Sequence, residues 1–159
     1  MKRLVVLCLL VLISCTQDLK PKESHPEKGS FDPVLVEKYG ADEYGMKKYV
    51  FAFLKRGPNQ DLDSLQKAEL QKAHLQNINR MAQEGKLVLA GPFFGNEDLR
   101  GIYVFNVKSL EEAEELTRSD PSIKAGLLTM ELKEWYGTAA LMGVNETHES
   151  LMKKNIVTD

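Results

Sequence analysis

His74 and Asp120 are residues of this chain whose side chains suit proton transfer. An imidazole gains or loses a proton near neutral pH. A carboxylate bound to one ring nitrogen fixes the tautomer and leaves the other nitrogen free to exchange a proton. Such a pair can act as a general acid or base. This chemistry requires the two side chains to meet, although they lie far apart in the sequence.

Each of the two residues also has an ordinary structural explanation. His74 lies in a helical pattern with Leu70 and Ile78, at the edge of an apolar stripe, where a partly buried histidine makes one hydrogen bond. Asp120 precedes Pro121, and this pair is typical of the first residues of a short helix, where the carboxylate caps the backbone. The residue pattern alone leaves the catalytic and the structural interpretations open.

Cys15 is a candidate for a different chemistry, covalent lipidation. An apolar run from Leu4 to Ile13 has the length of a signal peptide's hydrophobic region and is too short for a membrane span, which needs about 20 residues. Residues 12–15, Leu-Ile-Ser-Cys, resemble a bacterial lipobox. We therefore expect residues 1–14 to be a lipoprotein signal peptide and Cys15 to carry acyl chains that anchor the protein to a membrane. The alternative is an ordinary secretory signal with an unrelated cysteine.

Composition excludes several classes of function. The chain has 159 residues and a net charge of −2, and loss of the signal peptide with Lys2 and Arg3 makes it −4, so no nucleic-acid partner is expected. The two cysteines are Cys8, inside the signal peptide, and Cys15, so no thiol remains for a disulfide or a zinc site. No pair among the three histidines has metal-ligand spacing, and we expect neither a metal nor a cofactor.

The chain divides into five segments by composition. Residues 1–14 are followed by a polar tether at 15–30, which is rich in charge and contains proline and glycine. An N-terminal extension covers 31–47 and contains one short helix. A domain with clear periodic patterns covers 48–137, and a C-terminal tail covers 138–159, expected to be loosely held beyond about Asn145. With residues 1–14 as the signal peptide and Cys15 as the lipid anchor, we expect the domain to lie outside the cytoplasm, lipid-anchored in a bacterial cell envelope.

The domain's periodic patterns predict an α+β fold. Alternating or β-branched runs indicate strands, and capped runs with helical spacing indicate helices, in the order β-α-β-β-α-β. This order is typical of the ferredoxin-like arrangement, an antiparallel sheet with both helices on one face. The strands are expected at 49–54, 87–90, 102–107 and 128–135, and the helices at 61–84 and 109–118.

The same patterns predict which residues form the buried side of the long helix and which lie near the sheet face without helices. The long helix should bury one apolar stripe, made of Leu65, Ala68, Leu75, Ile78 and Ala82. The sheet face without helices must also be covered, and four aromatic residues are expected near it: Phe51, Phe53, Tyr103 and Phe105. Covering by a second copy of the chain predicts a homodimer.

An ordered set of short motifs resembles the YCII-related (YciI-like) domain family. No single motif is specific, but together they span about residues 48–137. They are His74-Leu75, Gly85 to Pro92, Gly101, Glu112-Ala113, Asp120-Pro121 and Ala125-Gly126. Gly40 to Met46 and Trp135-Tyr136-Gly137 resemble an envelope lipoprotein branch of the family.

The resemblance implies a ferredoxin-like domain of the dimeric α+β-barrel type with a His–Asp pair in a pocket. Carried over to this chain, the catalytic pair is His74 and Asp120. Many relatives have an arginine three residues before the histidine, where this chain has Gln71. Lys72 is the neighbouring candidate for binding a substrate anion.

Three functions remain open. The first is a cofactor-free lyase or isomerase that uses the His–Asp pair on a small organic molecule. The second is a non-catalytic module of the cell envelope that binds a small ligand, and the third is a dimeric interaction domain. The separation between a ring nitrogen of His74 and a carboxylate oxygen of Asp120 distinguishes the first two from the third.

Overall fold

The computed structural model describes residues 29–156, so the predicted signal peptide, Cys15 and most of the tether lie outside the described residues. The chain divides into two compact units, residues 1–32 and 33–159, and the helices and strands described below belong to the second. No helix within the described range is both long and apolar enough to cross a membrane.

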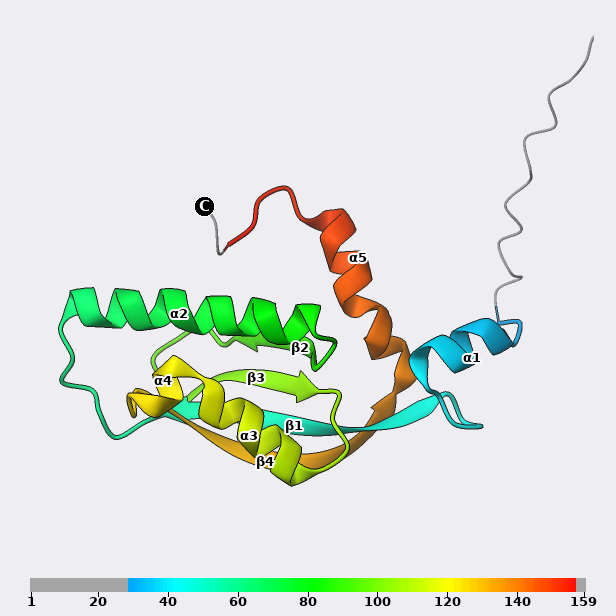
Figure 1. Cartoon of the computed structure of the whole chain (residues 1–159), viewed down its shortest axis with the longest axis horizontal. Coiled ribbons are helices and arrows are strands. Elements are labelled where there is room, and N and C mark those ends of the chain that lie inside the picture. The colour runs from blue at the N-terminus through cyan, green and yellow to red at the C-terminus, as the bar shows by residue number, and fades with distance from the viewer. Residues whose placement is uncertain (1–28, 157–159) are drawn as a thin grey trace, which may run out of the picture. The chain divides into compact units, whose positions relative to one another are not determined.

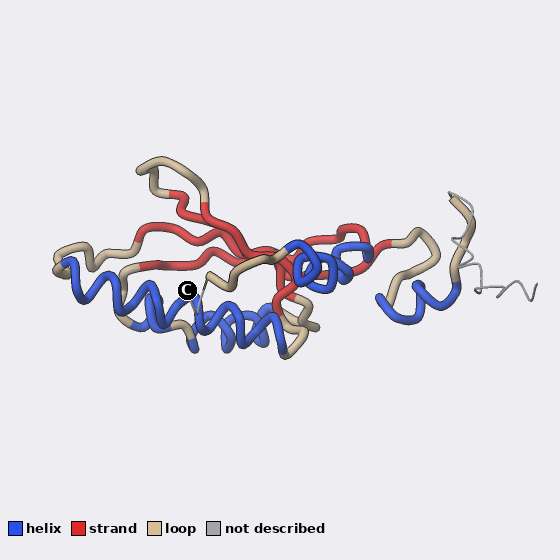
Figure 2. The backbone as a smooth tube through the Cα atoms, turned by 90° about the horizontal axis from the view of Figure 1, so that it is seen from above, coloured by secondary structure: helices blue, strands red, loops and turns tan. Residues whose placement is uncertain are grey.

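The domain is built on a four-stranded antiparallel sheet (Figure 1). The strand order is β2-β3-β1-β4. Helices α2 and α3 lie on one face of the sheet (Figure 2). This arrangement confirms the predicted α+β, ferredoxin-like fold. The strands are β1 (Met46–Arg56), β2 (Leu87–Pro92), β3 (Leu99–Phe105) and β4 (Leu128–Thr138), and the helices are α2 (Ser64–Gln83) and α3 (Leu110–Ser119).

Helix α2 begins slightly later than predicted because of its cap. The Asp63 side chain accepts a hydrogen bond from the Gln66 backbone, and the Gln66 side chain accepts one from the Asp63 backbone. This reciprocal capping box fixes the first helical residue at Ser64. The predicted end is confirmed, since Gly85 follows the helix with φ of 68°, a left-handed conformation that glycine adopts without strain.

The predicted apolar stripe of α2 is wrong in its first turn and only partly buried along the rest. Leu65 is 70% exposed, and the buried residues of the helix are His74, Asn77 and Met81. The sequence pattern missed this row of buried residues because two of its three members, His74 and Asn77, are polar. Leu75, Ile78 and Ala82 are partly buried and line a cavity that β2 also borders, and Ile78 also packs against the hydrophobic core.

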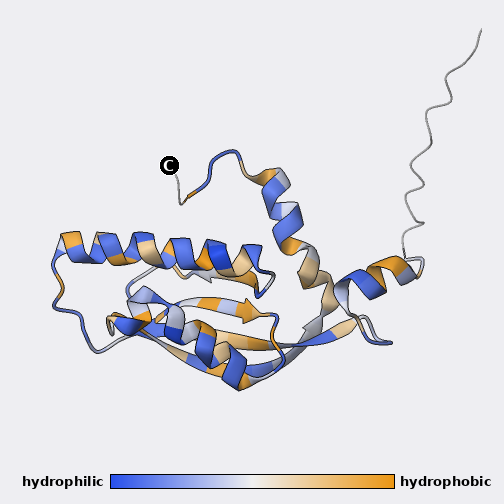
Figure 3. Ribbon diagram, in the orientation of Figure 1, coloured by the Kyte–Doolittle hydropathy of each residue, from blue (hydrophilic) through white to orange (hydrophobic). Residues whose placement is uncertain are grey.

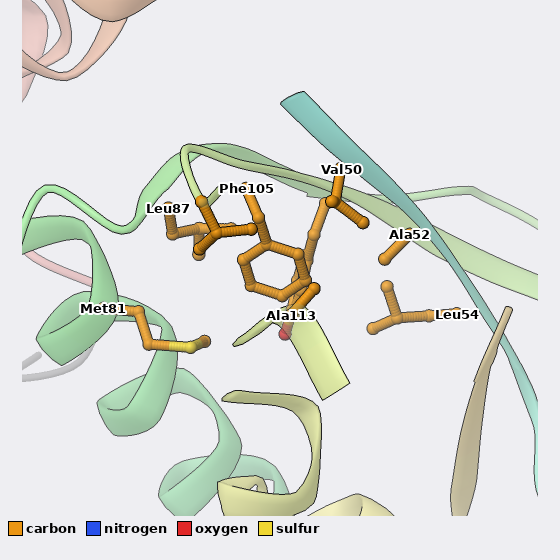
Figure 4. Packing of buried hydrophobic residues seen from close by; sticks show 9 residues of the cluster. Val50, Ala52, Leu54, Met81, Leu87, Phe105 and Ala113 are labelled. Carbon is orange, nitrogen blue, oxygen red and sulfur yellow. The ribbon is translucent and has the colours of Figure 1, made fainter. Parts of the chain in front are cut away.

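The hydrophobic core lies between the sheet and helices α2 and α3. Phe105 is completely buried there, close to Met81 of α2 and Ala113 of α3 (Figure 4). Tyr103 belongs to the same core, so the prediction that Tyr103 and Phe105 lie on the open face is wrong. The strand alternation was correct but its phase was reversed, and Val104 faces the other side. Figure 3 shows hydrophobic residues in β3 and mainly hydrophilic ones along α3.

The sheet face without α2 and α3 carries the remaining aromatic side chains. Phe51 contacts Phe53 and Trp135, with ring centroids 4.9 and 5.8 Å apart. At one end, Leu141 and Met142 pack against the buried cluster of this face. These two residues belong to a 3₁₀ helix, η1 (Ala139–Gly143), so the C-terminal tail covers part of the sheet itself.

The prediction of a loose tail beyond Asn145 is wrong. Helix α5 (Val144–Leu151) follows η1 directly, and the Asn145 side chain donates a 2.8 Å hydrogen bond to the Leu87 carbonyl oxygen of β2. The helix start gave no signal in the sequence because its cap position is Gly143, which has no side chain to bind the backbone. The predicted short N-terminal helix is present as α1 (Pro33–Tyr39).

Gly57 brings β1 and the loop before β4 into close contact. Its N–H donates a 2.9 Å hydrogen bond to the Leu127 carbonyl oxygen, and a Cβ atom on Gly57 would lie only 2.2 Å from the Gly126 oxygen. Only glycine permits this approach. The contact sets the position of Arg56 at the end of β1 relative to Leu128 at the start of β4, and both residues line a cavity described below.

Candidate functional site

His74 and Asp120 meet in the structure. The Nδ1 atom of His74 lies 2.8 Å from Oδ2 of Asp120, and the side chains are 9% and 1% exposed. His74 comes from the middle of α2, and Asp120 lies between α3 and the short helix α4 (Pro121–Lys124). The structure therefore brings together the two residues that the sequence analysis selected.

Asp120 is both the helix cap and the partner of the histidine. Its Oδ1 atom accepts hydrogen bonds from the backbone N–H groups of Ser122, at 2.9 Å, and Ile123, at 3.4 Å, which caps α4. Its Oδ2 atom accepts from His74 and from Nδ2 of Asn77, at 3.1 Å. The predicted cap is confirmed, and it leaves the second oxygen available to the histidine.

The hydrogen bonds keep Asp120 ionised despite its burial. Burial by itself raises the pKa of a carboxyl group. Hydrogen bonds from His74, Asn77 and the Ser122 N–H, together with the charge that His74 can carry, outweigh this effect and hold the pKa of Asp120 below its ordinary value. The carboxylate is therefore an acceptor at neutral pH, and Nδ1 of His74 is the donor.

Tyr103 completes the site on the other side of the imidazole. Its hydroxyl oxygen lies 3.2 Å from Nε2 of His74, and the two rings are stacked with centroids 6.1 Å apart. Burial, with a contribution from the Asp120 charge, raises the pKa of Tyr103 far above its ordinary value. The phenol therefore keeps its proton and donates a hydrogen bond to Nε2, while the Nδ1–H group donates one to Asp120.

The sequence analysis missed Tyr103 and Asn77. Tyr103 was assigned to the opposite sheet face, and Asn77 was not among the candidate residues. Asn77 follows His74 by three residues, which places both side chains on one side of the helix. That spacing was the available signal. The Asn77 amide is held by Nη2 of Arg80, which donates a 2.8 Å hydrogen bond to Asn77 Oδ1.

Lys72, the candidate for binding a substrate anion, is an exposed residue of α2. The residue before it, Gln71, lines a cavity of about 460 Å³ next to the pair, but Lys72 does not. Lys72's role stays a prediction. We call this space the basic cavity, and its polar lining consists of Arg56, Gln60, Lys67, Gln71, Arg100 and Ser122.

The basic cavity and the His74–Asp120 pair are neighbours. Ser122 lines the cavity, and its N–H is bound to Asp120. Neither His74 nor Asp120 is among the lining residues. Over residues 29–156, no three His, Cys, Asp or Glu side chains come together as metal ligands.

Comparisons with known proteins identify a family. The model of the YCII-related domain matches residues 50–136. The uncharacterized protein YjpA of Bacillus subtilis is 36% identical over 62 residues, which cover 39% of this chain and 71% of that protein. A solved structure, 5-chloro-2-hydroxyhydroquinone dehydrochlorinase from Burkholderia phenoliruptrix in complex with 2,5-dihydroxybenzoquinone, is 21% identical. It matches with a TM-score of 0.42 over 54% of this chain and 92% of that chain.

The lowered pKa of Asp120 predicts how stability depends on pH. In Asp120→Asn, the amide can still cap α4, but its NH₂ group faces two donors, Nδ1–H of His74 and Nδ2–H of Asn77. We expect a loss of about 1–3 kcal/mol in the free energy of unfolding at pH 7. The contribution of a carboxylate with a lowered pKa is present above its unfolded pKa of about 4 and is lost as pH falls through the folded pKa.

Denaturant unfolding of both proteins between pH 7 and pH 3 measures this effect. The difference between wild type and Asp120→Asn should shrink below about pH 4. Asp61→Asn, on an exposed residue before α2, is the matched control and should leave the profile unchanged. A difference that stays constant down to pH 3 would show that the Asp120 charge contributes nothing to folding.

Proposed function

This chain belongs to the YCII-related domain family, and on that premise we propose that it is a cofactor-free lyase or isomerase that moves a proton on a small organic molecule. The observation that carries the proposal is the buried hydrogen-bonded series Asp120–His74–Tyr103. Asp120 fixes the imidazole with its proton on Nδ1. The lone pair on Nε2 is then directed toward Tyr103.

His74 is the proposed catalytic base. A substrate that takes the place of the Tyr103 hydroxyl at Nε2 loses a proton from carbon to that nitrogen, and the electron pair stays on the substrate. The imidazolium carries its positive charge beside Asp120, which stabilises it. His74 then returns the proton to another atom of the substrate in an isomerase, or to the leaving group in a lyase. General acid–base help of this kind contributes about 10²–10⁴ in rate.

Tyr103 is the proposed electrophilic partner. Its raised pKa keeps the phenol protonated, so the hydroxyl released from Nε2 is a hydrogen-bond donor for negative charge that develops on a substrate oxygen. The buried surroundings strengthen this interaction because little water competes for the donor. Asp120 acts through His74 and is a positioning residue.

A second candidate function is a small-ligand-binding module without turnover. Two observations favour it. His74 and Asp120 are buried, and Nε2 of His74 already has a partner in Tyr103. In this case the pair stabilises the wall of a ligand site and transfers no proton.

Solvent deuterium exchange separates the two functions without knowledge of the natural substrate. The wild-type protein is incubated in D₂O with a panel of small enolisable carboxylic acids, and proton loss at carbon is followed by ¹H NMR. An enzyme should accelerate exchange for at least one compound. His74→Gln should reduce that rate about 10²-fold or more, and Tyr103→Phe should reduce it less. Equal exchange in wild type and His74→Gln would reject catalysis by His74.

We also propose that the protein is lipid-anchored in the bacterial cell envelope. The Leu-Ile-Ser-Cys sequence at residues 12–15, after a short apolar run, supports this location. Mass spectrometry of membrane-extracted protein should find Cys15 as an acylated N-terminus. Cys15→Ala should release the domain from the membrane or leave residues 1–14 uncleaved. A wild-type protein that is recovered without acyl chains and starts at another residue would contradict the proposal.

A homodimer through the sheet face without α2 and α3 is the proposed assembly. Phe51, Phe53 and Trp135 form the aromatic cluster on this face, and the C-terminal tail covers its other end. A second copy would bury the cluster. Sedimentation of a chain that starts at Ser30 should give a dimer at micromolar concentration, and Phe53→Lys should give a monomer. A wild-type monomer at every concentration would reject this assembly.

A further inference from the structure

We infer that the basic cavity is the subsite for the carboxylate of a small organic acid. The site would hold the anionic end of the molecule on which the His74–Asp120 pair acts. This assignment of the substrate class rests on the proposed function. The binding of an anion in the cavity is argued from the cavity itself.

The charges around the cavity are of one sign. Arg56, Lys67 and Arg100 line it, and no Asp or Glu is among its lining residues. In the part of the chain that the structure describes, none of these three cations forms a salt bridge with a carboxylate. Other basic residues, such as Lys55 with Glu131, are paired. A hollow with positive charge on its walls and no counter-charge attracts anions.

Neutral partners hold the cations in position. Nη2 of Arg56 donates to the Asn96 backbone and side-chain oxygens at 3.1 and 2.7 Å. Nη1 of Arg100 donates to the Gly95 carbonyl oxygen at 3.0 Å, and Nζ of Lys67 donates to the Gln60 carbonyl oxygen at 2.9 Å. These bonds fix the side chains without cancelling their charge. A pre-positioned site loses less conformational entropy when a ligand binds.

The remaining walls favour an organic anion over a free inorganic one. Ala68, Leu127 and Leu128 line the cavity together with the amides of Gln60 and Gln71. The apolar groups can contact a hydrocarbon body, while guanidinium groups match the planar geometry of a carboxylate. A volume of about 460 Å³ lies within the range of small-molecule sites.

The cavity lies where it can present a bound molecule to the pair. Ser122 lines it and also donates its backbone N–H to Asp120. Gln71, which also lines the cavity, precedes His74 by about one turn of α2. An acid whose carboxylate binds Lys67 and the arginines would therefore lie beside the residues that hold the pair in place.

A heteronuclear NMR titration of the full-length chain tests the inference. Benzoate is the probe, and benzamide is its neutral analogue of similar shape. Benzoate should shift the backbone signals of Gln71 and Ser122 in a saturable manner, and benzamide should not. Inorganic phosphate serves as the third ligand. Tighter binding of phosphate than of benzoate at the same signals would identify a site for inorganic anions only and overturn the inference.

Two lysines of α2 provide matched variants. Lys67→Gln should weaken benzoate binding about tenfold, which corresponds to the loss of one charge-assisted contact, and Lys67→Arg should restore it. Lys72→Gln removes the same charge from an exposed position outside the cavity and should change the affinity less than about twofold. Equal effects of Lys67→Gln and Lys72→Gln would overturn the inference, since they indicate general surface charge.

The outcome is independent of catalysis. Benzoate binding is measured without turnover, in the wild-type chain and its Lys67 variants, and His74 does not line the cavity. If deuterium exchange fails while benzoate binding depends on Lys67, the proposed enzyme is rejected and the anion site stands. If benzoate does not bind while exchange depends on His74, the anion site is rejected and the enzyme stands.

Discussion

A carboxylate buried away from water must have all its hydrogen bonds made within the protein, and Asp120 imposes this constraint on the domain. Its two oxygens bind four donors, which come from α2 and from the first turn of α4. One side chain therefore fixes the position of the long helix relative to the junction after α3. No buried side-chain polar atom in the described part of the chain lacks a partner, so the constraint is satisfied.

The same constraint sets the chemistry of the histidine. Because Asp120 accepts from Nδ1, the lone pair of the neutral imidazole lies on Nε2, and Tyr103 is positioned to donate to it. Burial raises the pKa of Tyr103, so the phenol stays protonated. The neighbouring basic cavity carries positive charge, and Arg56 and Lys67 have neutral hydrogen-bond partners there.

Local sequence signals predicted most of the fold, and the resemblance to the YCII-related family supplied the pairing of His74 with Asp120. Caps and glycine turns gave the order of elements, because they act within a few residues and Gly85 or Asp120 needs no distant contact to be recognised. Three features depended on tertiary packing and were missed. The phase of β3 decides which face receives Tyr103, and alternation alone allows either phase. Asn77 is buried by its bond to Asp120, and α5 is held by Asn145 on the edge of β2. These contacts join residues far apart in the chain, so no local pattern encodes them.

The central claim is that Asp120 fixes the tautomer of His74, and nitrogen NMR of the imidazole tests it most directly. In protein labelled with ¹⁵N at histidine, the neutral ring of His74 should show a proton bonded to Nδ1 and a bare Nε2. In Asp120→Ala, this preference should be lost and the two nitrogens should give signals averaged between the tautomers. A wild-type ring with its proton on Nε2, or one already averaged, would contradict the account.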